Sequence, residues 1–119
     1  MAEEYKSTVP LEQRQKETAD IRSMYPGKLP IFLEKFRKSA LPQIGKYKCL
    51  APRDNSMTGF IRGLRKKFKL DSTQGLFVFV GGRDLVTGDT LISELYERNR
   101  SEDGFLYLVY NEQPVLGSN

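Results

Sequence analysis

The hydrophobic residues of this chain are concentrated in a few short runs, and the longest run lies near the end. Residues 105–110 read F-L-Y-L-V-Y, which is apolar, aromatic or β-branched at nearly every position. This pattern is typical of a strand that is buried on both faces. Beyond Tyr110 the sequence turns polar, and Pro114 cannot donate a ladder hydrogen bond, so we expect the strand to end at Tyr110.

Two pairs of shorter apolar runs predict two hairpins. Residues 29–36 and 47–51 predict one antiparallel pair, joined by a loop that contains Pro42 and Gly45. Residues 75–80 and 85–86 predict a second pair, which turns at two glycines. Lys46 directly precedes the run of residues 47–51, and Lys48 lies within it. Such charges are typical of an edge strand whose outer side stays unpaired.

One stretch after the first hairpin has the clearest helical periodicity in the chain. Asn55 or Ser56 is a suitable cap, and apolar residues then recur at helical spacing. They are Met57, Phe60, Ile61, Leu64 and Phe68, while the other face carries Arg62, Arg65, Lys66 and Lys67. The basic face is consistent with an anion-binding site or with a solvated helix surface. Gly59 and Gly63 each cost about 1 kcal/mol relative to alanine inside a helix.

Two weaker patterns predict helices elsewhere. Asp89 is expected to cap a brief helix whose inward residues are Leu91, Ile92, Leu95 and Tyr96. Residues 10–25 predict a helix with Pro10 in its first turn, ended by Pro26 and Gly27. Its narrow apolar stripe, which consists of Leu11, Ile21, Met24 and Tyr25, is too small to build a core, so we expect this helix to dock on a larger body.

The predicted order is helix, then β-β-α-β-β-α-β, with the last strand between the first and the third. This α+β order is the β-grasp arrangement of ubiquitin-like domains. We expect an N-terminal helical arm over residues 1–27, the ubiquitin-like domain over 28–111, and a flexible tail over 112–119. The tail is either an ordinary frayed terminus or a segment that enters another protein.

Composition narrows the function. The 119 residues contain no histidine and one cysteine, Cys49, so the usual catalytic pairs and zinc sites are missing, and we expect no enzyme, no metal and no cofactor. The formal net charge of +4 favours acidic partners without choosing among them. The basic residues of 62–69 are not interleaved with exposed aromatic residues, since Phe68 belongs to the apolar face, and this argues against nucleic-acid binding. With no signal peptide or membrane-spanning run, we expect a cytosolic or nuclear monomer.

Several motifs resemble those of one family. They are I-R-S-M-Y-P-G-K-L-P-I at 21–31, E-K-F at 34–36, K-Y-K-C-L-A-P at 46–52, G-L-F-V-F-V at 75–80, L-Y-E at 95–97 and E-D-G-F-L-Y-L-V-Y at 102–110. In this order and spacing the chain resembles the autophagy ubiquitin-like modifiers, the group that includes the GABA-A receptor-associated protein and the microtubule-associated light chain.

The resemblance implies a function for the tail. A cysteine protease of the family would trim the chain after Gly117 and release Ser118 and Asn119. Activating and conjugating enzymes would then attach the new carboxylate to phosphatidylethanolamine, which would hold the modifier on autophagosomal membranes while the unattached form stays cytoplasmic. Glycine suits this chemistry because it has no Cβ to crowd narrow enzyme clefts.

The resemblance also implies two pockets for cargo-receptor peptides of the form aromatic-x-x-aliphatic, added as a strand along 46–50. The aromatic pocket would use Glu17, Ile21, Pro30, Phe32, Lys48, Leu50 and Phe105. The second pocket would use Ala51, Pro52, Phe60, Gly63 and Leu64. Lys28, Lys46, Lys48 and Arg65 would attract acidic residues that flank the motif.

This sequence departs from the family pattern around the second pocket. Gly63 replaces a leucine, Asn55 replaces an aliphatic residue, and Cys49 stands where an aromatic is common. We therefore expect a larger or shallower second pocket with an altered or weakened preference for the aliphatic residue. The alternative function is a cytosolic adaptor that is not conjugated and binds peptides or microtubules through its basic faces.

Overall fold

The computed structural model describes residues 1–86 and 88–117, and its secondary structure follows the predicted order with one additional helix. The helices of this part are α1 (Ala2–Thr8), α2 (Leu11–Met24), α3 (Met57–Phe68) and α4 (Ile92–Asn99). The strands are β1 (Lys28–Lys35), β2 (Lys48–Pro52), β3 (Phe77–Val80), β4 (Asp84–Val86) and β5 (Leu106–Asn111).

The strands form one mixed sheet in the order β2-β1-β5-β3-β4. β1 and β2 are antiparallel, as are β3 and β4, which confirms both predicted hairpins. β5 lies between β1, to which it is parallel, and β3, to which it is antiparallel. The sheet therefore has the β-grasp topology, with the last strand at its centre.

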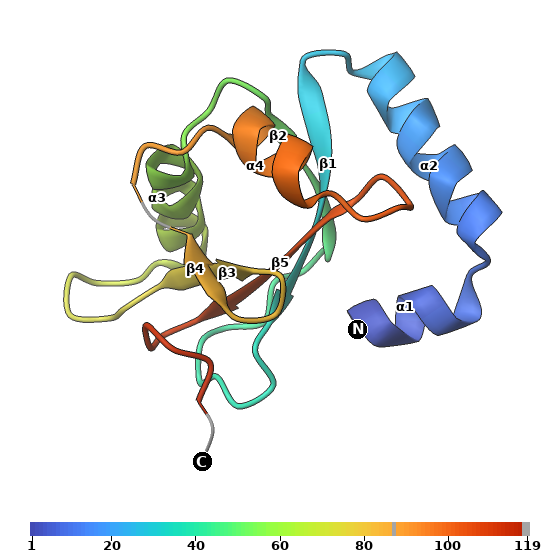
Figure 1. Cartoon of the computed structure of the whole chain (residues 1–119). Coiled ribbons are helices and arrows are strands. Elements are labelled where there is room, and N and C mark those ends of the chain that lie inside the picture. Colours follow the sequence, from blue (N-terminus) through green and yellow to red (C-terminus); the bar gives the residue numbers. More distant parts are fainter. Residues whose placement is uncertain (87, 118–119) are drawn as a thin grey trace.

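Helices lie on both sides of this sheet (Figure 1). α3 and α4 cover one face, where Ile31, Leu33 and Leu108 meet Met57 and other buried residues to form the main core. α1 and α2 lie on the other side, next to β1. The periodic apolar residues of α3 are all buried or half-buried, as the sequence pattern predicted.

The predicted N-terminal cap is correct for α3 and wrong for α4. The Ser56 hydroxyl accepts a hydrogen bond from the Gly59 amide at 3.1 Å, which confirms Ser56 as the cap of α3. Asp89 does not cap α4, which begins after Leu91 and uses the Glu94 carboxylate to accept the Leu91 amide at 3.1 Å. Leu91 is 37% exposed, so the prediction that it faces inward is also wrong.

The N-terminal arm differs most from prediction. Residues 2–8 form the unpredicted helix α1, and Pro10 precedes the first turn of α2 rather than lying inside it. Met24 and Tyr25 are 68% and 44% exposed, so they do not belong to a docking stripe. α2 instead buries Arg14 and Thr18, because Arg14 Nη1 pairs with Asp103 Oδ2 at 2.7 Å and the Thr18 hydroxyl donates to the Asp103 carbonyl at 2.6 Å.

Strand ends shift by one or two residues. β3 begins at Phe77 rather than residue 75, and β5 continues to Asn111, which pairs with Phe77 across the sheet. Asn111 is buried, so a polar residue closes the central strand where the sequence predicted an end at Tyr110.

Candidate functional site

β2 forms one edge of the sheet. Among the described strands it pairs only with β1, so its outer side offers backbone donors and acceptors to an added strand. This placement confirms the prediction of an edge strand. Successive side chains of β2 point to opposite faces, which sends Lys48 and Leu50 toward α2 and directs Cys49 and Ala51 toward α3.

A small pocket opens on the α2 side of this edge. It has a volume of about 150 Å³ and is lined by Ile21, Lys48, Cys49, Leu50 and Phe105. Four of these residues belong to the predicted aromatic pocket. Its apolar lining and single ammonium group suit an aromatic side chain of a peptide whose backbone lies along β2.

The other predicted members of the aromatic pocket take different positions. Pro30 is buried in β1 opposite Leu50, and Phe32 is buried in the same strand but lines a different cavity. Glu17 lies on α2 and reaches the pocket through Lys48, whose Nζ is 2.9 Å from Glu17 Oε2 and 3.1 Å from Oε1. The ion pair spans the gap between α2 and β2 at the pocket mouth.

A neighbouring cavity contains residues that the sequence did not suggest. It has a volume of about 370 Å³ and is lined by Met1, Glu4, Tyr5, Thr8, Phe32, Tyr47 and Lys48. Tyr5 of α1 is central, because its ring stacks on Phe32 at 5.2 Å between centroids and meets Phe105 edge-on at 5.9 Å.

Tyr5 also contacts both members of the ion pair between Lys48 and Glu17. Its hydroxyl donates to Glu17 Oε1 at 2.7 Å, and Lys48 Nζ lies 4.2 Å from the centre of its ring. Burial, followed by the hydrogen bond to Glu17, raises the pKa of the Tyr5 hydroxyl well above its usual range. Tyr5 therefore lines the larger cavity and contacts the ion pair beside the small pocket.

The residues predicted for the second pocket come from β2 and α3. Ala51 and Leu64 are buried in the core, Phe60 is half-buried, and Pro52 and Gly63 are exposed. Cys49 on β2 packs against the same core.

The two helix glycines have different surroundings. A Cβ at Gly63 would meet no heavy atom within 4 Å outside its own helix backbone, so the space beside Gly63 is open. A Cβ at Gly59 would lie 2.3 Å from Asn55 Oδ1, so the Asn55 side chain already occupies that space. Cys49 contributes a half-buried thiol whose pKa burial raises to about 11.

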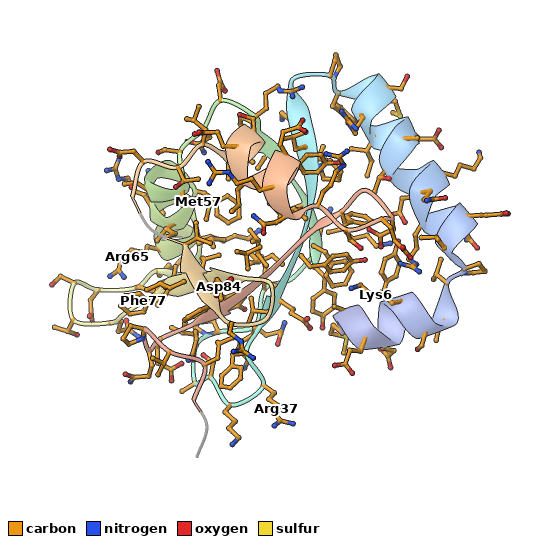
Figure 2. All side chains as sticks on the ribbon, in the orientation of Figure 1. Lys6, Arg37, Met57, Arg65, Phe77 and Asp84 are labelled. Carbon is orange, nitrogen blue, oxygen red and sulfur yellow. The ribbon has the colours of Figure 1, made fainter. Side chains whose placement is uncertain are left out.

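The basic residues predicted to attract acidic peptide flanks fall into two groups. Lys28 and Lys46 are exposed at the start of β1 and just before β2. Arg65 is half-buried, and its guanidinium donates to the Gln74 carbonyl at 2.7 Å and to the Asp71 carbonyl at 2.6 Å. Figure 2 shows Arg65 on the side of α3 that faces the loop before β3, which it fixes in place.

The tail leaves the domain where β5 ends. Glu112 Oε1 accepts from the Ser39 hydroxyl at 2.5 Å, and Glu112 Oε2 accepts from the Ala40 amide at 3.0 Å. The Asn111 side chain donates to the Val115 carbonyl at 2.9 Å. Gly117 is exposed, whereas Ser118 and Asn119, which we expect to be released, lie outside the described residues.

Neither a membrane-spanning helix nor a metal-binding cluster occurs in residues 1–86 and 88–117. None of the helices described there is long and apolar enough to cross a membrane. No group of three or more cysteine, aspartate or glutamate side chains in residues 1–86 and 88–117 is arranged to hold a metal ion.

Comparison with known proteins gives one consistent result. Residues 13–117 match the family model described as autophagy protein Atg8, ubiquitin like. The chain is 40% identical over 114 residues to Autophagy-related protein 8A of Oryza sativa subsp. indica, covering 96% of this chain and 95% of that protein. It is 39% identical over 114 residues to Autophagy-related protein 8a of Arabidopsis thaliana, covering 96% and 93%. The crystal structure of Trypanosoma brucei ATG8 superposes with a TM-score of 0.84 at 31% identity, covering 95% of this chain and 97% of that one.

Proposed function

Because the chain belongs to the Atg8 family of ubiquitin-like autophagy proteins, we propose that it is a modifier that is trimmed after Gly117 and conjugated to phosphatidylethanolamine. The observation that carries this proposal is the exposed Gly117, six residues beyond the end of a central buried strand. In this proposal a cysteine protease and activating and conjugating enzymes act on the chain, which itself catalyses nothing and needs no cofactor.

The lipid would make membrane attachment stable. Each buried CH₂ group contributes about 0.8 kcal/mol, and phosphatidylethanolamine brings two acyl chains, which is the number needed for lasting anchorage. The modifier would then divide between the cytoplasm and the autophagosomal membrane.

On the membrane, the modifier would capture cargo-receptor peptides of the form aromatic-x-x-aliphatic. The peptide would add as a strand to β2, with its aromatic residue in the pocket of Ile21, Leu50 and Phe105 and its aliphatic residue between β2 and α3. Burying the aromatic side chain would contribute about 1.5–3 kcal/mol. Lys28 and Lys46 are exposed where acidic flanking residues would lie.

The experiment is an intact-mass measurement of the protein recovered from membranes of starved source cells. We expect loss of residues 118–119 together with the added mass of phosphatidylethanolamine on Gly117. A Gly117→Ala variant serves as the control and should stay full-length and diffuse in the cytoplasm. A full-length, unmodified wild-type chain in cells that form autophagosomes would contradict conjugation and favour the adaptor.

A further inference from the structure

The tail is bound to the domain at its first residue, Glu112, which we call the root of the tail. The Glu112 carboxylate uses both oxygens, one for the Ser39 hydroxyl at 2.5 Å and one for the Ala40 amide at 3.0 Å. Ser39 is buried, and its hydroxyl also accepts from the Leu41 amide at 3.1 Å, so the partner of Glu112 is itself held in place. The hydrogen bond from Ser39 is the main reason that the pKa of Glu112 is lowered.

The backbone of residue 112 is confined from the other side. A Cβ at Gly75 would lie 2.5 Å from the Glu112 carbonyl oxygen, which shows how closely the segment before β3 approaches the tail. The root of the tail therefore lies between the loop that follows β1 and the segment that precedes β3.

Beyond its root the tail folds back toward the domain. Buried Asn111 donates its side-chain amide to the Val115 carbonyl at 2.9 Å. Gly117 then lines a pocket of about 190 Å³ with Phe36, Lys38 and Val115, and with Asn111, Glu112 and Gln113 at the root. The tail is therefore bent back toward the domain as far as Val115, while Gly117 itself is exposed at the edge of this pocket.

The processing protease needs the tail in an extended conformation. Six residues beyond Asn111 could reach about 20 Å if fully extended. Trimming breaks the peptide bond between Gly117 and Ser118 with one water molecule, leaving a carboxylate on Gly117 and an amine on Ser118. The scissile carbonyl must enter the protease cleft for this reaction, so the folded tail has to open first.

We propose that Asn111, Glu112 and Ser39 form a tail latch that keeps the start of the tail bent toward the domain and sets the fraction of molecules whose tail is free to enter the processing enzyme. These are positioning residues, since the chemistry belongs to the enzyme, and the inference rests on the proposed trimming after Gly117. When only a fraction of a substrate is competent to bind, its apparent affinity falls by that fraction. The latch therefore acts on KM and leaves kcat unchanged.

The kinetic test follows trimming of the full 119-residue chain by a purified processing cysteine protease of the autophagy system, with intact mass as the readout. Glu112→Ala and Ser39→Ala remove the two sides of the latch. We expect each to lower KM by about threefold to tenfold at constant kcat. Because the two residues share one hydrogen bond, their effects should not add in the double variant. Gln113→Ala is the matched control on the same tail and should trim like wild type.

The second test needs no enzyme. The Ala40 amide donates to Glu112 only while the latch is closed. By NMR, its hydrogen exchange should be faster in Glu112→Ala than in wild type and unchanged in Gln113→Ala.

The outcomes separate the latch from the proposed function. If the protease cuts wild type after Gly117 and trims every variant with the same KM as wild type, the proposed latch is contradicted. A higher KM in Glu112→Ala would also overturn it, because the contact would then present the tail instead of retaining it. If the protease fails to cut wild type after Gly117, the proposed trimming fails, and Ala40 exchange alone still supports or refutes the latch.

Discussion

At the scale of single residues, Gly63 is the most informative departure from the family pattern. It is exposed on α3, and a Cβ there would meet no heavy atom within 4 Å outside its own helix backbone. In the proposed mode of peptide binding, this position would lack one wall of the second pocket. A peptide residue placed there would bury less apolar surface than it would against leucine.

Gly63→Leu should therefore improve both folding and peptide binding. Replacing glycine inside a helix stabilises it by about 1 kcal/mol. An added contact worth about one buried methylene would strengthen binding of a peptide with leucine at the aliphatic position about fourfold. Urea unfolding and peptide titration measure the two effects.

Gly59→Leu is the control for this substitution, because its side chain would collide with Asn55. We expect little gain in affinity from it. An ordinary preference for leucine or isoleucine over phenylalanine, at normal affinity, in the unmodified chain would contradict the idea of an altered pocket.

The lone thiol of Cys49 should react slowly in the folded protein. Burial raises its pKa from 9.0 to about 11, and the thiolate is the reactive form, so its fraction at pH 8 falls by about 100-fold. We expect alkylation by iodoacetamide at pH 8 to be at least that much slower in the native protein than in guanidinium chloride. The Cys49→Ser variant gives the background rate. Equal alkylation rates in the native protein and in guanidinium chloride would show that the thiol is exposed in the folded state.

At the scale of elements, the sequence predicted those helices and strands whose signals are local. β1, β2 and α3 follow from continuous or periodic apolar residues, and Ser56 supplies the expected cap. α1 has no buried residue and depends on Tyr5, whose partners Phe32 and Phe105 are distant in sequence. The pattern of residues 2–8 alone therefore contained too little information to predict the helix.

Tyr5→Ala should release α1 from the sheet. A helix of seven residues is too short to be stable by itself, and this change removes the stacking on Phe32 and the hydrogen bond to Glu17. Hydrogen exchange of residues 2–8, followed by mass spectrometry, should approach the rate of an unfolded chain.

Tyr5→Phe retains the ring without the hydroxyl and serves as the comparison for this experiment. Its α1 should stay largely protected. Full protection of α1 in Tyr5→Ala would show that other contacts, such as Lys6 Nζ at 4.0 Å from the centre of the Tyr107 ring, suffice.

At the scale of the whole molecule, the arm and the domain are joined by a buried ion pair. Arg14 of α2 meets Asp103, which is 89 positions away, in the turn before β5. Asp103 also accepts from the Phe105 amide at 2.9 Å and from the Tyr107 hydroxyl. The sequence predicts α2 only as a docking helix with a narrow apolar stripe, because nothing local to Arg14 indicates a carboxylate so far along the chain.

Asp103→Asn should destabilise the protein strongly. It leaves the Arg14 guanidinium buried without its counter-charge, and breaking one partner of a buried pair costs far more than losing a surface pair. We expect the melting temperature to fall by about 10 °C or more in a calorimetric scan.

The double variant Arg14→Met and Asp103→Asn removes both charges and should recover part of this loss. Lys16→Ala breaks the exposed pair with Asp20 and is the control, with little expected change. A melting temperature for Asp103→Asn equal to that of wild type would show that the pair does not secure the arm.

The central position of β5 has a mechanical consequence. β5 is bonded to β1 on one side and β3 on the other, and the tail continues directly from its end. If Gly117 is the point of membrane attachment, tension from the bilayer runs along β5 and strains the bonds to both neighbours together. Cargo held on β2 would pull on β5 through β1, the strand that lies between them. Single-molecule pulling between Gly117 and residue 48 would measure this resistance, and we expect the domain to bear load as a tether between cargo and bilayer without unravelling from its edge.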